Sequence, residues 1–342
     1  MAARSTHPLA AGKLPGDLLA RLIETYRTPA DDAVIVEASY GFDAAALTIG
    51  GETLIVKSDP ITFATENAAH YLVAVNANDI ACLGGIPRWM TVVALLPENR
   101  TTEASVEAMF ADLQAACTSA GITVLGGHTE ITLQLDRALL IGTMLGTAGP
   151  TGLLLPGKAS AGDELYVTKA IGIEGTALLA TERADILRPV LGTEALDVAA
   201  RLIHEPGISV VRDARIALDT GCVTALHDPT EGGLATAVHE ISEASGLGAT
   251  VERSQVPIRQ DTAAICESLK IDPLGLLSSG ALLIAAKPGS QETLQAAFDG
   301  SSIAITRIGT LTAPEAGHTL VSDSDTWLLP RYDADELTRA LS

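Results

Sequence analysis

Aspartates at the ends of predicted elements are the side chains of this sequence best suited to chemistry. Asp43 lies on a turn between two apolar runs, Asp59 ends an apolar strand, and Asp79 lies in a predicted helix that is apolar on nearly every side. Burying a carboxylate is costly unless it is paired or bound to a metal. Carboxylate oxygens suit Mg²⁺, which proteins often share with the phosphates of a nucleotide. The pattern therefore favours a magnesium–phosphate site, with pairing of Asp79 to an arginine such as Arg88 as the structural alternative.

A pair of glycines provides a second candidate region. Gly126 and Gly127 follow a predicted strand and precede His128 and Glu130. Paired glycines after a strand allow the backbone to approach a ligand closely. An ordinary glycine turn with a surface histidine is the alternative.

Another glycine pair stands ahead of a predicted helix. His227 and Asp228 end a strand, and Gly232 and Gly233 lead into the helix. The free N–H groups of a helix N-terminus favour anions, so this segment predicts a site for phosphate or for a metal–phosphate group. Helix capping by the aspartate or threonine of the segment is the alternative. The loop that contains Lys169 also precedes a helix and predicts a weaker version of the same cofactor-binding arrangement.

The elements that must position these residues alternate between strands and helices in both halves of the chain. Helices are predicted over 66–83 and 101–120, and Gly50-Gly51 joins two apolar runs as a hairpin. Such alternation predicts layered α/β or α+β architecture. The turn-rich stretch 147–158 separates the halves. The predicted parts are an N-terminal helical extension at 1–32, an α/β domain at 33–150 and a second α/β domain at 158–342.

Composition narrows the class of partner. The 342 residues include 42 Asp and Glu against 22 Lys and Arg, a formal net charge of −20. This charge repels a phosphate backbone, so neither nucleic acid nor an anionic membrane is expected as a partner. No stretch of about 18 apolar residues predicts a membrane span. The 4 cysteines lie far apart, as expected in the reducing cytoplasm.

Taken in order, these segments resemble the aminoimidazole ribonucleotide (AIR) synthetase superfamily, and in particular its HypE-like, synthase-related branch. The most specific of them are NDIACLGGIPRW and DPTEGGLA. The matching segments are GFDAAAL (41–47), KSDP (57–60), NANDIACLGGIPRW (76–89), GGHTE (126–130), TKAIGIEG (168–175), HDPTEGGLA (227–235) and LLSSGALLIA (276–285).

The resemblance implies a fold and a set of site residues. Two α/β-type domains are expected, with N-terminal domains that pair into a β-barrel across a homodimer and bind ATP with Mg²⁺ near that interface. Asp43, Asp59, Asp79 and Asp228 become the candidates for magnesium and triphosphate positioning. Other implied nucleotide- or substrate-facing residues are Asn76, Asn78, Gly126, Gly127, Glu130, Gly232 and Gly233. The implied catalytic residues are His227, His128 and Glu130.

The implied reaction is transfer of the γ-phosphoryl group of ATP to an amide or carbonyl oxygen of a small substrate. HypE itself carries its acceptor thiol in a C-terminal Pro-Arg-Ile-Cys tail, whereas this sequence reads Leu329-Pro330-Arg331-Tyr332 and has no cysteine after Cys266. An enzyme without an acceptor thiol of its own is therefore expected. Two alternatives are a small-molecule kinase of the thiamine-monophosphate kinase type and a non-catalytic nucleotide-binding partner in a maturation complex.

Overall fold

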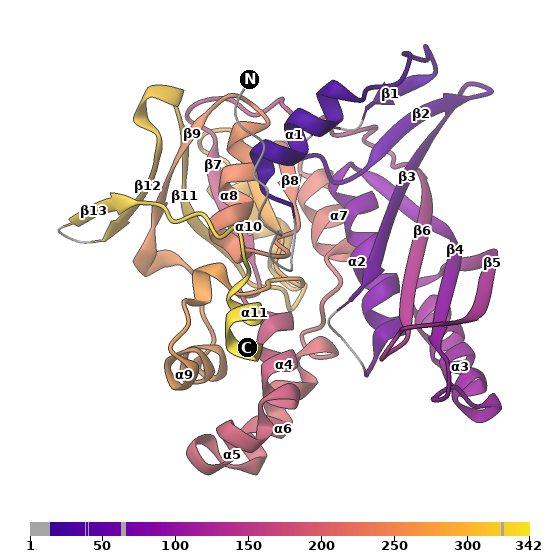
Figure 1. Cartoon of the computed structure of the whole chain (residues 1–342). Helices are drawn as coiled ribbons and strands as arrows, with labels where there is room; N and C mark the ends of the chain where they lie inside the picture. The colour runs from indigo at the N-terminus through magenta and orange to yellow at the C-terminus, as the bar shows by residue number, and fades with distance from the viewer. Residues whose placement is uncertain (1–13, 38, 40, 63–65, 323–324) are drawn as a thin grey trace.

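Two mixed β-sheets with their covering helices form a two-domain α+β fold (Figure 1). The structure is a computed structural model, and it describes residues 14–37, 39, 41–62, 66–322 and 325–342. The predicted helical extension is represented by α1 (Gly16–Thr25), and the part of that prediction at 1–13 lies outside the described residues. The bounds predicted for the domains stay a prediction.

The first sheet has six strands and lies on the right in Figure 1. Neighbouring strands are antiparallel except for the parallel pair β4 and β5. In spatial order the strands are β1 (Val34–Val36), β2 (Ala45–Ile49), β3 (Glu52–Ile61), β6 (Leu139–Ala148), β4 (Gly85–Pro97) and β5 (Thr123–Thr132). The described part of the chain contains no closed barrel, because β1 and β5 are the two edges of this sheet.

Local sequence explains the elements of this domain. Gly50 and Gly51 adopt positive φ angles of 61° and 89° and join β2 to β3 as the predicted hairpin. Helix α3 (Glu103–Ala120) begins with a capping box between Thr102 and Ser105 and ends at Gly121 in the left-handed conformation. The hairpin and the helix confirm predictions made from the sequence.

Helix α2 (Ala68–Cys82) lies between the first sheet and the second domain (Figure 1). It packs on β3, β6 and β4 with one side and against α7 and β8 of the second domain with another. This explains why its sequence is apolar nearly all round: a helix covered on several sides has no solvent face to fill with polar residues. Leu72 and Ile80 are fully buried in it.

The second sheet has seven strands, of which only β9 and β12 pair in parallel. In spatial order they are β13 (Asp325–Leu328), β12 (His318–Ser322), β9 (Gly248–Glu252), β11 (Ile305–Thr312), β7 (Glu164–Thr168), β10 (Leu283–Ala286) and β8 (Val223–His227). The helices of this domain are α4 (Ile173–Glu182), α5 (Ala184–Leu191), α6 (Thr193–Ala200), α7 (Val211–Asp219), α8 (Gly233–Glu243), α9 (Gln260–Leu269), α10 (Gln291–Phe298) and α11 (Glu336–Leu341).

The place predicted for Gly126 and Gly127, after a strand, is wrong, and so is the alternative of a glycine turn, because β5 continues through both residues to Thr132. A ligand-binding role for these glycines stays a prediction. A Cβ atom on Gly127 would lie against the carbonyl oxygen of Val92, so glycine there serves the contact between β4 and β5. The neighbouring Leu125 is skipped in the register between the two strands, as in a β-bulge.

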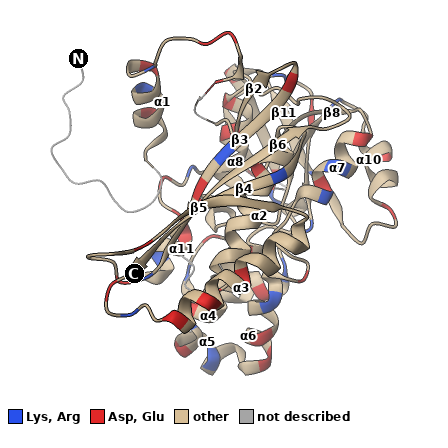
Figure 2. Ribbon diagram, turned by 90° about the vertical axis from the view of Figure 1, so that its right-hand side faces the viewer, with Lys and Arg blue, Asp and Glu red and all other residues tan. Residues whose placement is uncertain are grey.

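Acidic residues lie on several of the helices that cover the sheets. Figure 2 shows acidic positions on helices α1, α3 and α10, among others. Within the described ranges, the helices are too short or too polar to cross a membrane.

Candidate functional site

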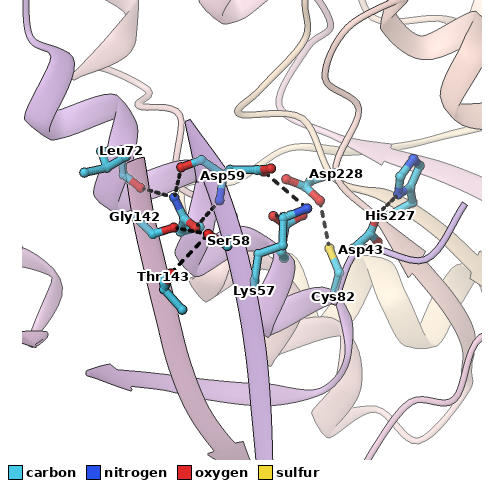
Figure 3. A network of polar contacts seen from close by, with 12 residues as sticks. Asp43, Lys57, Ser58, Asp59, Leu72, Cys82, Gly142, Thr143, His227 and Asp228 are labelled. Carbon is cyan, nitrogen blue, oxygen red and sulfur yellow. Dashed lines mark hydrogen bonds and ion pairs between the residues drawn. The ribbon is translucent and has the colours of Figure 1, made fainter. Parts of the chain in front are cut away.

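The predicted aspartates converge where the two domains meet (Figure 3). Asp43 precedes β2, Asp59 lies near the end of β3, and Asp79 projects from the last turn of α2. The second domain adds His227, the last residue of β8, and Asp228 immediately after it. Three elements of the first domain and one strand end of the second therefore build one polar cluster inside an otherwise apolar contact.

Lys57 is the cation of this cluster. It lies two residues before Asp59 on β3 and therefore on the same face of the strand. Its Nζ atom is 3.2 Å from Oδ2 of Asp59 and 3.0 Å from Oδ2 of Asp79 (Figure 3). Burial alone would lower the pKa of Lys57, but the carboxylates of Asp79, Asp59 and Asp43 outweigh it and raise the pKa. The lysine is therefore firmly cationic.

The structural alternative for Asp79, an ion pair with an arginine such as Arg88, is wrong. Lys57 takes that place, and the guanidinium of Arg88 instead lies over the ring of Trp89, 5.4 Å from its centroid. The sequence contained the signal, since Lys57 and Asp59 stand at i and i+2 in the KSDP segment. Reasoning that weighed only carboxylates did not assign the lysine a role.

His227 lies between two carboxylates. Its Nδ1 is 2.8 Å from Oδ1 of Asp43, and its Nε2 is 2.8 Å from Oε2 of Glu240 on α8. Burial lowers the pKa of His227, but Asp43 and Glu240 outweigh it, so the pKa lies well above its ordinary value. The imidazolium therefore orients Asp43, and both nitrogens are occupied in this arrangement. An acid–base role for His227 stays a prediction.

Asp228 is the most deeply buried carboxylate of the cluster, with 1% of its surface exposed. Its Oδ1 accepts a hydrogen bond from Sγ of Cys82 at 3.6 Å, and its Oδ2 has no hydrogen-bond partner among the described residues. Burial, followed by the charge of Asp43, raises the pKa of Asp228 to about 7. Burial and Asp228 also raise the pKa of Cys82, which keeps that side chain a neutral thiol.

The carboxyl groups of the cluster outnumber its cations. Five carboxyl groups, those of Asp43, Asp59, Asp79, Asp228 and Glu240, surround two cationic groups, on Lys57 and His227. Buried like charges repel one another, and protonation or a bound cation is needed to relieve that repulsion. Burial, followed by the charge of Asp228, also raises the pKa of Asp79 well above its ordinary value, so protonation of Asp79 and Asp228 relieves part of this excess.

A divalent cation with oxygen ligands fits this set. Ligand atoms of Asp43, Cys82 and Asp228 lie within 4.8 Å of one another, and the buried Oδ2 of Asp228 is unpartnered in the described structure. The carboxylates are hard ligands suited to Mg²⁺, whereas the neutral thiol of Cys82 is not. A cavity beside Asp43 and His227 has a volume of about 30 Å³. This is room for a water molecule or an ion, so a nucleotide would have to bind outside it.

The two asparagines of α2 have different roles. Oδ1 of Asn76 accepts from the backbone N–H of Asp59 at 3.1 Å, which supports β3 beside the cluster. Asn78 instead reaches the second domain: its Nδ2 donates to the carbonyl of Ile208 at 2.9 Å and its Oδ1 accepts from N–H of Val210 at 2.8 Å. Asn78 therefore fastens the domains together.

Lys169 is committed to protein groups. Its Nζ donates to the carbonyls of Ser209 at 2.7 Å and Gly280 at 3.0 Å, and lies 3.2 Å from Oδ1 of Asp213. Burial lowers the pKa of Lys169 more than Asp213 raises it. These contacts account for the three donors of the ammonium group. The cofactor role predicted for Lys169 receives no support from them.

An aspartate of the chain occupies the N-terminus of α8. The N–H of Gly232 donates to Oδ2 of Asp335 at 2.7 Å, and Oδ1 of Asp335 accepts from Leu277 and Leu337. A Cβ on Gly233 would lie 2.5 Å from the carbonyl oxygen of Leu274. These glycines therefore permit close packing and carboxylate binding within the protein. Binding of a nucleotide phosphate by them stays a prediction.

His128 and Glu130 lie away from the cluster within this chain. Nε2 of His128 is 3.1 Å from Oε2 of Glu130 on the exposed strand β5. Strands β4 and β6 separate β5 from β3, which carries Lys57 and Asp59. These two residues can join the cluster only through another copy of the chain.

Glu174 is a buried carboxyl that sequence reasoning did not single out. It lies in the first turn of α4 with 7% of its surface exposed, and its Oε2 has no hydrogen-bond partner in the described part of the chain. Burial, opposed by the hydroxyl of Ser279 and assisted by the charges of Glu231, Asp335 and Asp228, raises the pKa of Glu174 to about 8. Perturbed carboxyls of this kind are concentrated at functional sites. Its only signal in the sequence was its place in TKAIGIEG.

The comparisons with known proteins agree with this architecture. Residues 41–148 match the AIR synthase related protein, N-terminal domain, and residues 160–321 match its C-terminal domain. Carbamoyl dehydratase HypE of Rhodobacter capsulatus is 28% identical over 282 residues, which cover 80% of this chain and 78% of that protein. The Escherichia coli (strain K12) protein of that name is 28% identical over 266 residues, which cover 75% and 74%.

Solved structures share the fold at lower identity. Hydrogenase maturation protein HypE in complex with ATP superposes with a TM-score of 0.70 at 21% identity, covering 96% of this chain and 97% of that one. Thiamine monophosphate kinase from Aquifex aeolicus gives a TM-score of 0.68 at 16% identity, covering 91% and 98%. The two domain matches together extend over most of the chain, which therefore belongs to the AIR synthase-related family.

Proposed function

We propose that this chain is an ATP- and Mg²⁺-dependent enzyme that phosphorylates an amide or carbonyl oxygen of a small substrate. The observation that carries the proposal is the acidic cluster that both domains build around Lys57, with its excess of carboxylates and the unpartnered Oδ2 of Asp228. A HypE structure in complex with ATP and a ThiL structure with AMPPCP and TMP support the nucleotide.

The cluster has the parts that phosphoryl transfer requires. Such a reaction asks the protein for positioning and charge stabilisation rather than for covalent chemistry. Bound by Asp43 and Asp228, Mg²⁺ would supply the positive charge that holds the triphosphate and stabilises the transferred group. Lys57 fixes the orientation of Asp59 and Asp79 through its two ion pairs, and His227 fixes that of Asp43. Tertiary contacts thus preorganise the carboxylates before ligand arrives.

The acceptor in this proposal is a separate molecule. Residues 267–342 contain no cysteine. The segment after β13 is anchored to the second domain, since N–H of Tyr332 donates to Oγ1 of Thr236 at 3.1 Å and its hydroxyl donates to Asp272 at 2.8 Å. Neither a thiol nor a loose segment is therefore available there to receive the phosphoryl or another group.

A homodimer is part of the proposal. All but the last residue of β5 are exposed, and so are the apolar side chains of Leu125 and Ile131 on it. An exposed strand edge with apolar side chains favours pairing with another strand. Pairing of two copies along β5 would begin the barrel expected for this family and would bring His128 and Glu130 to the interface between subunits.

Two alternatives have specific support. The thiamine monophosphate kinase structure shares the fold, and a kinase of that type would leave the phosphate on its product. A HypE–HypF complex is also among the similar structures, which favours a maturation-complex partner as the other alternative.

Nucleotide turnover tests the proposal. Purified chain is mixed with ATP, Mg²⁺ and a set of small amides and carbonyl compounds, and released phosphate and phosphorylated product are both measured. Asp79→Asn and Asp228→Asn are expected to lower turnover at least about 100-fold, as loss of metal-positioning groups does. Asp219→Asn, an exposed ion-paired aspartate of α7, is the matched control.

The outcomes separate the alternatives. Phosphate retained on the product indicates a kinase, and phosphate release indicates the synthase-type reaction. ATP binding without turnover favours the partner in a complex. Absence of any thermal shift with millimolar ATP and Mg²⁺ would refute all three, because a ligand that binds the folded state must raise its stability.

A further inference from the structure

A second group of metal-ligating side chains includes two residues of helix α8. His239 and Glu243 stand four residues apart on this helix and therefore face the same way. His318, the first residue of β12, completes the group: its ring centroid lies 4.1 Å from that of His239. One ligand atom from each of the three lies within 4.8 Å of the other two. We propose that His239, Glu243 and His318 bind a divalent transition-metal ion such as Zn²⁺.

The outer nitrogen of His239 is held by the protein. Its Nε2 is 3.2 Å from the carbonyl oxygen of Leu329, which can only accept, so Nε2 carries the proton. The Nδ1 atom is left with its lone pair and faces Oε1 of Glu243 at 3.8 Å. That distance is too long for a hydrogen bond. Two ligand atoms that are each about 2.0–2.1 Å from a tetrahedral Zn²⁺ lie about 3.4 Å apart, so the separation of Nδ1 and Oε1 exceeds that value by about 0.4 Å.

His318 is held in the same manner. Its Nε2 lies 2.7 Å from Oγ of Ser242, and that hydroxyl also contacts the carbonyls of Val238 at 2.7 Å and His239 at 3.0 Å. A hydroxyl has one proton, and the two carbonyls compete for it. Ser242 therefore accepts from Nε2–H of His318, which leaves Nδ1 of His318 as the nitrogen with a lone pair. Metal-binding histidines characteristically donate their other N–H to a protein acceptor in this way.

The backbone of Leu329 is hydrogen-bonded to both histidines. Its carbonyl accepts from His239, and its N–H donates to the carbonyl of His318 at 3.0 Å. The ligands therefore come from a helix and a strand, and the backbone of Leu329 is hydrogen-bonded to a residue of each. Such a frame limits movement of the imidazoles to side-chain rotation. The ligand atoms lie within 4.8 Å of one another, whereas tetrahedral zinc ligands lie about 3.4 Å apart, so rotation must shorten the widest separation by up to about 1.4 Å.

The donor set selects the class of ion. Two imidazole nitrogens and one carboxylate suit Zn²⁺, Co²⁺ or Ni²⁺, whereas Mg²⁺ prefers oxygen. Arg331 shares the oxygen that faces His239, since its Nη1 is 2.8 Å from Oε1 of Glu243. The carboxylate can still bind the ion, because each of its two oxygens has more than one lone pair. This site is chemically distinct from the carboxylate cluster, although Glu240 of that cluster lies on the same helix, next to His239.

Cobalt binding tests the proposal without reference to enzymatic activity. The chelator-treated full chain is titrated with Co²⁺, whose visible absorption reports nitrogen and oxygen ligands in a tetrahedral site, and Zn²⁺ is then used to displace it. An Asp228→Asn background removes competition from the carboxylate cluster. We expect one Co²⁺ per chain and a loss of affinity of at least about 100-fold in His239→Ala and in His318→Ala.

A second pair of facing histidines gives the matched control. The rings of His70 and His204 lie 4.8 Å apart, and no carboxylate or thiol completes a three-ligand group with them among the described residues. His204→Ala should therefore bind Co²⁺ as the parent does. Glu243→Gln replaces the carboxylate by an amide of nearly the same size and should weaken Co²⁺ binding about tenfold. Because this change leaves the packing of the helix intact, it separates loss of a ligand from misfolding of the alanine variants.

Two results would overturn the proposal. One is the absence of a visible cobalt spectrum at about millimolar Co²⁺ in the Asp228→Asn background. The other is an unchanged spectrum in the His239→Ala/His318→Ala double variant, since the ion would then be bound elsewhere. A normal circular dichroism spectrum of each variant is required for either comparison.

Discussion

Replacement of Glu174 by glutamine tests the electrostatics of the interior most directly. The carboxyl of Glu174 is buried in the first turn of α4, and burial raises its pKa to about 8. The folded protein therefore keeps a proton that the unfolded chain releases at neutral pH. Glutamine has nearly the same shape and cannot ionise, so the change isolates this proton.

The sign and size of the effect follow from linkage. In the unfolded chain the carboxyl of Glu174 has its ordinary pKa of 4.5. The pKa of Glu174 is higher in the folded protein than in the unfolded chain. The free energy of unfolding is therefore unaffected by this group below about pH 4.5, and it falls as the pH rises toward 8, because the unfolded chain can release the proton and the folded protein cannot. Each pH unit within this window is worth about 1.4 kcal/mol. Between about pH 5 and pH 7, Glu174 therefore lowers the free energy of unfolding by roughly 2–3 kcal/mol.

Urea unfolding at three pH values measures this effect. We expect the stability of Glu174→Gln, relative to the parent, to increase by that amount from about pH 5 to pH 7. Glu182→Gln, at the exposed far end of the same helix, should give a curve parallel to that of the parent. Parallel curves for Glu174→Gln as well would refute the reasoning, because they would mean that the buried carboxyl titrates as it does in the unfolded chain.

Four further predictions concern the cluster, the domain contact and the dimer. Lys57→Met leaves Asp59 and Asp79 without their cation and should lower the free energy of unfolding by about 3–5 kcal/mol in urea, whereas Lys287→Met, at an exposed site, should not. Asn78→Ala breaks two buried hydrogen bonds between the domains and should cost about 2–4 kcal/mol in the same assay, and a loss below about 0.5 kcal/mol would contradict the role assigned to it. Chelation of Mg²⁺ should abolish ATP binding in calorimetry, and binding indifferent to chelator would contradict a metal-bridged nucleotide. Ile131→Asp should shift the mass measured by light scattering from dimer to monomer, and an unchanged dimer would exclude pairing along β5.

Much of the local structure could be predicted from the sequence. The Gly50-Gly51 hairpin, helix α2 and the caps of α3 follow from turn chemistry, apolar patterning and capping residues, which act over a few neighbours. The glycine pair at 126–127 was the exception. It has the composition of a turn, but the close approach of β4 explains it, and that contact involves residues far apart in the sequence.

The candidate site was predicted in part. Asp43, Asp59 and Asp79 were expected together because carboxylates in apolar segments require a partner, and the family resemblance added Asp228. Which partner each one has was decided by the fold. Lys57, rather than an arginine, pairs with Asp79, and Glu240 reaches His227 from a helix of the second domain.

Sequence by itself determined that this chain would bury carboxylates within two aliphatic α+β domains and would resemble the AIR synthase-related family. It did so because composition, periodicity and motif order are properties of the chain alone. Only the tertiary structure decided which charges meet. Asp335 accepts from Gly232, which lies 103 residues earlier at the start of α8. The rings of His239 and His318 meet across 79 residues of chain. Such contacts depend on how sheets and helices pack, and no local spacing encodes them.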